Sequence, residues 1–378
     1  AELADALDSK SSGAIRAGSS PASGIRIKDL TEKSVRSLLY TIKKHERNKK
    51  MEKDKSFLGT ESVGKLLLQL ALPTVAAQLI NMLYNIVDRI YIGHIPGEGA
   101  LALTGVGVCM PLIMVVSAFA ALVGNGGAPR ASIFMGKNDT SKAEQTLGNC
   151  FTMQIIISLI LTVILFLGNR SLLLAFGASA NTIDYAVGYM NIYAVGTIFV
   201  QLTLGMNNFI TAQGFAKTGM LSVLIGAISN IILDPVFIFG FHMGVRGAAL
   251  ATVISSIPAS GSSPSSLEKD LPEASEKHHE TESRYHSACM ALGSSLFVMQ
   301  LSESVISVCY NSSLLKYGGD VAVGAMTILT SVMQFAMLPL QGLGQGAQPI
   351  ISYNYGARNE KRVRSTFKLL IKQVFLIP

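Results

Sequence analysis

The sequence predicts an all-α, polytopic membrane protein whose helices form two lobes, the second of them incomplete. Three observations support this fold class. Of 378 residues, 49% are apolar and 15% are charged, whereas soluble proteins carry about 25% charged residues. The apolar residues form long blocks, most of them longer than the roughly 20 residues that a helix needs to cross hydrocarbon. One segment also repeats along the chain. A disordered chain, a coiled coil and an ordinary soluble enzyme are thereby excluded.

Up to nine membrane helices are expected from the apolar blocks. The blocks cover residues 63–92, 101–134, 147–166, 183–210, 220–241, 247–257, 288–315 and 321–351, and a last block starts at Phe367. The sixth block is too short to cross a membrane, and the ninth runs to the last residue, Pro378. Both features predict a truncated or altered protein with two incomplete spans.

Composition divides the chain into four regions. They are a polar, basic arm at 1–56, a first lobe with spans one to six at 57–257, a polar linker at 258–287 and a partial second lobe with spans seven to nine at 288–378. The four cysteines lack metal-ligand spacing, so we expect neither a disulfide frame nor a zinc site.

Positive charge is distributed unevenly: residues 1–65 hold 14 of the 31 Lys and Arg residues. The basic loops at Lys137, Lys217 and residues 358–364 fall on the side of this arm and alternate with sparsely charged loops. The positive-inside rule therefore predicts a multi-pass protein of the cell membrane with a cytoplasmic N-terminus. No recognition fold follows the arm, so membrane lipid, and not nucleic acid, is the expected partner.

An internal repeat occurs at a constant offset of 220 residues. Seven identities share this register without a gap, among them Gly124 with Gly344, Pro129 with Pro349 and Gly136 with Gly356. Six spans separate the two copies, and because this number is even, both copies keep the same orientation. The repeat predicts two lobes related by an axis along the membrane normal, which is a transporter architecture.

Two acidic residues lie within the spans of the first lobe, where ionisable groups are costly. Asp88 shares a helical face with a polar stripe, which consists of Gln78, Asn81 and Asn85. Asp234 lies one turn after Asn230 and directly before Pro235, which has no N–H to donate to the Ile231 carbonyl. The alternatives are that Asp88 pairs with adjacent Arg89 at the interface, and that Asp234 merely ends a helix before a proline turn.

A third intramembrane acid, Glu303, shares a face with Gln300 in the second lobe. It is either a second-lobe site or a structural hydrogen-bonding residue. Burial disfavours a charged carboxyl, so such groups bind a proton or hold a hard cation. A proton or Na⁺ is therefore expected at Asp88, Asn230 and Asp234. Either change would alter helix packing and couple an ion gradient to a substrate.

Several runs of the sequence resemble the multidrug and toxic compound extrusion (MATE) transporters. These runs are Tyr84–Gly93, the segment Asn230 to Pro235, Gly247–Thr252 and Gln345–Pro349. The resemblance covers about 58–255 and 292–372 and implies twelve helices in two six-helix bundles, of which this chain has about nine. By resemblance, the ion-binding network includes Asp88, Asn207, Asn230, Asp234 and Thr252. Tyr189 lies beside it, and Gln300 and Glu303 match a second-lobe cation site.

The leading functional hypothesis is an antiporter, likewise implied by the family, that exports amphipathic or cationic small molecules in exchange for H⁺ or Na⁺. It is expected to act without a cofactor, as a monomer, and not as an enzyme. Three alternatives stay open. They are a related two-lobed exporter of a lipid-linked or peptide substrate, a membrane-embedded enzyme, and an inactive membrane fragment. An enzyme would need a His/Asp or Ser/His constellation within the spans, yet all six His lie in loops, at span ends or in the arm.

Overall fold

The computed structural model describes residues 57–261 and 279–375. By its internal contacts the chain divides into two units, Ala1–Asp54 and Lys55–Pro378, and the described residues all belong to the second. The predicted arm at 1–56 and the middle of the predicted linker, 262–278, lie outside the described residues. The ends of that linker, 258–261 and 279–287, are helical.

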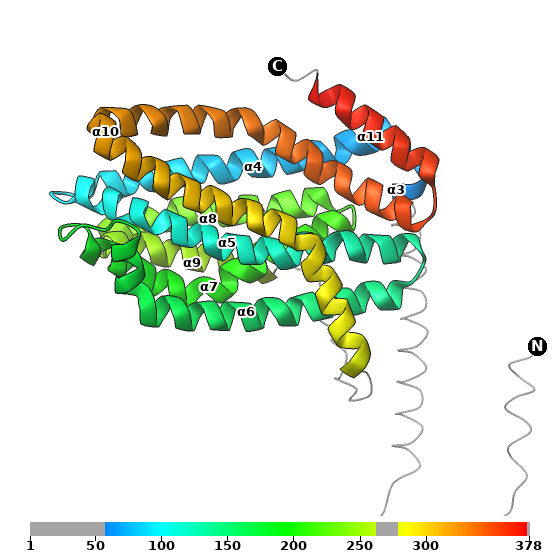
Figure 1. The fold of residues 1–378 in the computed structure, drawn as a ribbon, viewed down its shortest axis with the longest axis horizontal. Helices are drawn as coiled ribbons and strands as arrows, with labels where there is room; N and C mark the ends of the chain where they lie inside the picture. The colour runs from blue at the N-terminus through cyan, green and yellow to red at the C-terminus, as the bar shows by residue number, and fades with distance from the viewer. Residues whose placement is uncertain (1–56, 262–278, 376–378) are drawn as a thin grey trace, which may run out of the picture. The chain divides into compact units, whose positions relative to one another are not determined.

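Every regular element within the described residues is helical, which agrees with the predicted all-α class (Figure 1). In chain order the elements are α3 (Phe57–Thr60), α4 (Val63–Gly93), α5 (Gly99–Gly136), α6 (Thr140–Ala175), α7 (Ile183–Ala212), α8 (Ala216–Pro235), the π-helix η1 (Val236–Gly240), α9 (Val245–Gly261), α10 (His279–Gly356) and α11 (Glu360–Val374).

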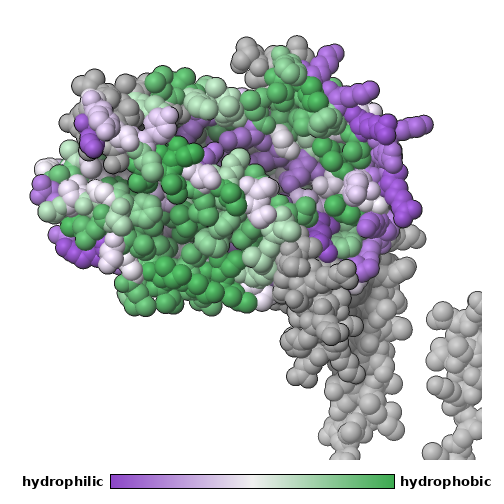
Figure 2. Space-filling model, viewed as in Figure 1, coloured by the Kyte–Doolittle hydropathy of each residue, from purple (hydrophilic) through white to green (hydrophobic). Residues whose placement is uncertain are grey.

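Six helices within the described residues are long and apolar enough to cross a membrane. They are Val63–Gly93, Gly99–Gly136, Thr140–Ala175, Ile183–Ala212, Ala216–Gly240 and Cys289–Tyr310. The apolar part of α9, Val245–Ile257, is shorter, as the sixth block predicts. Figure 2 shows apolar residues over the middle of these helices on the face in view, with hydrophilic residues gathered toward α3 and α11. This distribution is typical of a chain that crosses a membrane.

Helix α10 is continuous over 78 residues and joins two blocks that the sequence predicts as separate spans. At 1.5 Å per residue a straight helix would place Gly293 and Gly356 about 95 Å apart. Gly293 nevertheless packs on Leu122 and Gly356 on Ile133, positions only about 17 Å apart along α5. Helix α10 therefore doubles back, as its ribbon does in Figure 1. Its first arm lies along α5, whereas its second arm packs on α4 and reaches α5 near its end.

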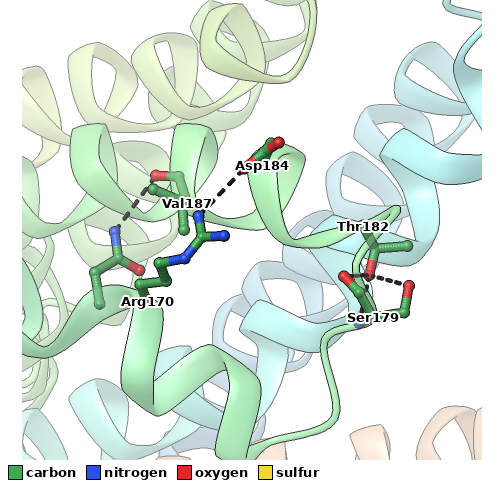
Figure 3. A network of polar contacts seen from close by, with 6 residues as sticks. Arg170, Ser179, Thr182, Asp184 and Val187 are labelled. Carbon is green, nitrogen blue, oxygen red and sulfur yellow. Dashed lines mark hydrogen bonds and ion pairs between the residues drawn. The ribbon is translucent and has the colours of Figure 1, made fainter.

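The turn between α6 and α7 is held by polar side chains (Figure 3). Arg170 of α6 pairs with Asp184 of α7 at 3.3 Å. Thr182 Oγ1 accepts a hydrogen bond from the backbone N–H of Ser179 at 3.0 Å. This turn lies at the end of the helices opposite the loops with Lys137 and Lys217, because α6 and α7 each cross the bundle once.

The turns that end the two copies of the repeat have the same backbone conformation. Asn138 and Arg358, which are 220 residues apart, both adopt the left-handed region with φ of 60° and 56°. Asp139 and Asn359 then cap α6 and α11 by accepting the backbone N–H three residues later, at 3.1 and 3.3 Å. The two copies of the repeat thus end in the same kind of turn and helix cap.

Glycine contacts across the lobes also occur in pairs. Gly136 packs against the carbonyl of Tyr353, and Gly356 packs against the carbonyl of Ile133, so the offset of 220 maps one contact onto the other. Only glycine allows backbones to approach this closely. This reciprocal packing is the signature of a pseudo-twofold axis between the two copies.

Candidate functional site

The two acids of the first lobe meet between α4 and α8. Asp88 is 7% exposed, Asp234 is fully buried, and their carboxyl groups lie close enough to interact directly. The buried amide of Asn230 donates from Nδ2 to Asp234 Oδ1 at 3.3 Å. Two acids from separate helices thus come together in the interior of the first lobe.

Pro235 determines the local backbone at this site. It is the last residue of α8, and the π-helix η1 follows it directly. A proline cannot donate to the carbonyl four residues earlier, so the regular α-helical hydrogen-bond pattern is interrupted beside Asp234. Single π turns of this kind are frequent at functional sites. The alternative of a proline turn after a helix end does not hold, because the chain stays helical to Gly240.

Three acceptor oxygens of the site are buried and have no hydrogen-bond partner. They are Asp88 Oδ1, Asp234 Oδ2 and Asn230 Oδ1. Leaving buried polar atoms unpaired costs roughly 1–3 kcal/mol each. A proton or a hard cation would satisfy such oxygens. These three oxygens are therefore suited to bind a proton or a cation.

Aromatic and hydroxyl groups surround the acid pair. The hydroxyl of Tyr189, which is buried in α7, forms a side-chain hydrogen bond with Thr252 of α9, and Tyr189 lies close enough to Asp88 for electrostatic interaction. Tyr84 interacts in the same way with both Asp88 and Asp234. Tyr84 was not among the predicted site residues, although it lies one helical turn before Asp88 on the same face.

Asn207 lies away from the site, contrary to what the resemblance implies. Its Oδ1 lies beside Gly219, near the start of α8, where an added Cβ would be 2.6 Å from this oxygen. Asp234 follows fifteen residues later, about 22 Å along that helix. Asn207 belongs to α7 close to the opposite end of the lobe, so its unpartnered Oδ1 serves a different environment.

The polar stripe on α4 divides between two surroundings. Gln78 donates to Gln345 Oε1 of α10 at 3.3 Å. Asn81 is half-buried, whereas Asn85 is exposed and donates to the Asn81 carbonyl at 2.7 Å. Only Asp88, at the end of the stripe, turns into the interior of the lobe.

The alternative pairing of Asp88 with Arg89 is not what the structure forms. Arg89 is exposed, and its charge acts on Asp88 through space, while the buried carboxyl of Asp88 faces Asp234. Adjacent helical residues project about 100° apart, so Asp88 can face α8 while Arg89 faces outward.

The second-lobe candidates differ from the first-lobe pair. Gln300 is half-buried and Glu303 is exposed, whereas the neighbouring Ser304 is buried and donates to the Pro111 carbonyl at 3.3 Å. The face of α10 that packs on α5 carries Ser304 and not Glu303. Glu303 therefore lacks the dry environment predicted for an ion site.

Long membrane helices, a repeated half and a buried acid pair together define a two-lobed membrane transporter. A model of the MatE family matches residues 73–236 and 295–377. The chain belongs to this family of transporters, which confirms the family resemblance and the prediction that it is not an enzyme.

Known relatives agree in sequence and in fold. The multidrug export protein MepA of Staphylococcus haemolyticus is 28% identical over 323 residues, 85% of this chain and 71% of that protein. MepA of Staphylococcus aureus is 26% identical over 317 residues, 83% of this chain and 69% of that protein. A solved structure described as an outward-facing multidrug resistance MATE family transporter of the MOP superfamily has a TM-score of 0.77 at 24% identity and covers 85% of this chain and 71% of its own.

Proposed function

We propose that this chain is an antiporter that exports amphipathic or cationic small molecules across the cell membrane in exchange for protons. The close approach of the buried carboxyl groups of Asp88 and Asp234 carries the proposal. Membership of the MatE family and the names of the MepA relatives, which are multidrug export proteins, support the substrate class.

The choice of the proton rests on hydrogen-bond chemistry. An ionised carboxylate only accepts hydrogen bonds, and two neighbouring buried carboxylates repel each other, so a proton shared by the pair supplies the missing donor and removes the repulsion. Asn230 donates its amide N–H to Asp234 Oδ1 and so orients that carboxyl group within the pair. The Asp88–Asp234 pair is thus the group that takes up and releases the coupling proton.

Uptake of this proton from outside would change the contact between α4 and α8, because it removes the repulsion between two neighbouring carboxylates. Helix α4 also contacts the second lobe, where Thr74 Oγ1 donates to the Gly342 carbonyl at 2.7 Å. Pro73 lies next to this contact inside α4 and provides a place for the helix to bend. A change at Asp88 is thereby passed along α4 to the seam between the lobes, where it expels the substrate outward.

In this proposal the protein is a monomer of four regions, the arm 1–56, the lobes 57–257 and 288–378, and the linker 258–287. Its N-terminus faces the cytoplasm. The ends of α5, α7 and α10 then lie at the cytoplasmic face with the basic residues Lys137, Lys217 and Arg358. We call this end of the helices the basic end. The acid pair lies in the half of the first lobe farther from it.

The test is ethidium transport by the purified chain in liposomes, driven either by a pH gradient or by a Na⁺ gradient. We expect transport with the pH gradient, and we expect Asp88→Asn and Asp234→Asn to reduce it at least about tenfold, as is typical when a group essential to proton transfer is removed. The matched control Glu303→Gln alters an exposed carboxyl and should retain transport.

The alternatives give different results in the same assay. Transport driven only by Na⁺ would replace the proton by a cation bound at the three unpartnered oxygens of Asp88, Asp234 and Asn230. Absence of ethidium transport, with transport of a lipid-linked or peptide substrate, would favour a related exporter. Absence of both would identify an inactive membrane fragment. Unchanged transport by both Asp variants would refute the role of the acid pair.

A further inference from the structure

A buried hydrogen-bond cluster joins the two lobes at the basic end. The guanidinium of Arg362, in α11, donates from Nη2 to the carbonyls of Leu58 and Glu61 at 3.1 and 2.7 Å. Its Nε donates to Asn354 Oδ1 at 3.1 Å. The Asn354 amide, fully buried in α10, in turn donates to the Leu58 carbonyl at 2.9 Å. Four hydrogen bonds thus interlock three segments.

Three of these four bonds cross the boundary between the lobes. Leu58 and Glu61 precede α4 and belong to the first lobe, whereas Asn354 and Arg362 belong to the second. Both donors of the second lobe converge on the Leu58 carbonyl, whose residue is itself fully buried. Hydrogen bonds from a charged donor are roughly twice as strong as neutral ones, and burial strengthens them further.

The cluster is not an automatic product of the internal repeat. The offset of 220 places Lys142 where the second copy has Arg362, and Phe134 where it has Asn354. Lys142 pairs with Asp139, the cap of its own helix, at 2.8 Å. A planar guanidinium can hold several acceptors in fixed directions, whereas an ammonium cannot. The residues that bridge the lobes are therefore specific to the second copy.

We propose that Arg362 and Asn354 form a latch that closes the two lobes against each other at the basic end and must open whenever the transporter loads substrate there. This inference rests on the proposed alternating exposure of an exporter, but not on which ion drives it. Opening the latch breaks the three hydrogen bonds between the lobes and exposes the Leu58 carbonyl. Arg362 is thus a positioning residue that sets the balance between the two exposures of the transporter.

The test is a distance measurement between spin labels on the full chain. Labels replace the exposed residues Lys217 of the first lobe and Ser365 of the second, after the exposed cysteine Cys309 is changed to Ser. We expect Arg362→Gln to shift the ratio of short to long distances about tenfold toward long ones, since it removes a charged donor. Arg364→Gln is the matched control, because Arg364 pairs only with exposed Glu360 of its own helix among the contacts described, at 3.5 Å.

Arg362→Lys keeps the charge but loses the planar fork, and we expect its distances to lie between those of the original chain and Arg362→Gln. This variant also serves where Arg362→Gln does not fold. Distances in Arg362→Gln or Arg362→Lys that match those of Arg364→Gln would overturn the latch. Because the distances are measured without a gradient or a dye, a failure of proton-driven transport leaves this result intact and overturns only the proposed function.

Discussion

Replacing Gly356 by Ala tests how tightly the two lobes pack. A Cβ at Gly356 would lie 2.9 Å from the carbonyl carbon of Ile133 and 3.0 Å from its Cα, and closer still to the carbonyl oxygen. Ordinary contacts begin at 3.4 Å. Because the obstacle is backbone on both sides, no rotamer change relieves it. Helices α5 and α10 must separate by roughly 1 Å at this crossing to restore normal contact.

The magnitude follows from a comparison within the same helix. Gly344 of α10 has nothing within 4 Å of its Cβ position. Gly344→Ala should therefore stabilise the protein by up to about 1 kcal/mol, through helix propensity alone. Gly356→Ala should instead destabilise it by about 1–3 kcal/mol, the usual cost of overpacking. The free energies of unfolding of the two variants should thus differ by about 1–4 kcal/mol.

The assay is unfolding of the purified protein in mixed detergent, followed by circular dichroism, for the original chain and both Ala variants. Gly136→Ala provides a second measurement, because Gly136 packs on Tyr353 as Gly356 packs on Ile133. Equal stability of Gly356→Ala and Gly344→Ala would refute the close crossing of α5 and α10. A large effect at Gly356 with none at Gly136 would refute the reciprocal packing of the two copies.

Two further predictions concern the turns of the repeat. Hydrogen bonds from Lys142 hold the pKa of Asp139 below its usual range, so its stabilising effect is present above about pH 4 and is lost as the pH falls through the lowered value. Asp139→Asn, which places at this cap the residue found at Asn359, should change the free energy of unfolding at pH 7 by no more than about 0.5 kcal/mol. It should also reduce the loss of stability below about pH 4. An unchanged dependence of stability on pH would contradict this prediction. Arg358→Gly should raise stability by up to about 1 kcal/mol, because φ is 56° there; lower stability in the same assay would show that the Arg358 side chain outweighs the strain.

Much of the fold was predictable because a membrane imposes simple rules on a sequence. Long apolar blocks must be helices, since hydrocarbon cannot satisfy free backbone groups. The matching positions Gly136 and Gly356 predicted a repeat, and the paired turns and glycine contacts agree with it. Spans seven and eight were predicted as separate helices, whereas the structure has one helix, α10, that stays helical through the residues at which it reverses direction.

The candidate site was predictable only in part. Asp88, Asn230 and Asp234 were predicted from the cost of polar groups in a membrane helix, and the structure brings these three together. Asn207 and Glu303 look equally unusual in sequence. Asn207 nevertheless lies beside Gly219 of α8, about 22 Å along that helix from Asp234, and Glu303 is exposed. The polarity of a residue does not determine which way its helix is rotated.

The sequence by itself therefore determined the helical membrane class, the duplicated half and the acids that make a costly site. Only the tertiary structure decided which acids share one interior and how the lobes are held. The latch illustrates the reason. Its acceptors are the backbone carbonyls of Leu58 and Glu61, and every residue has a carbonyl, so no pattern of residue types distinguishes these two. Their role arises only when α11 folds back to place Arg362 beside them, about 300 residues later in the chain.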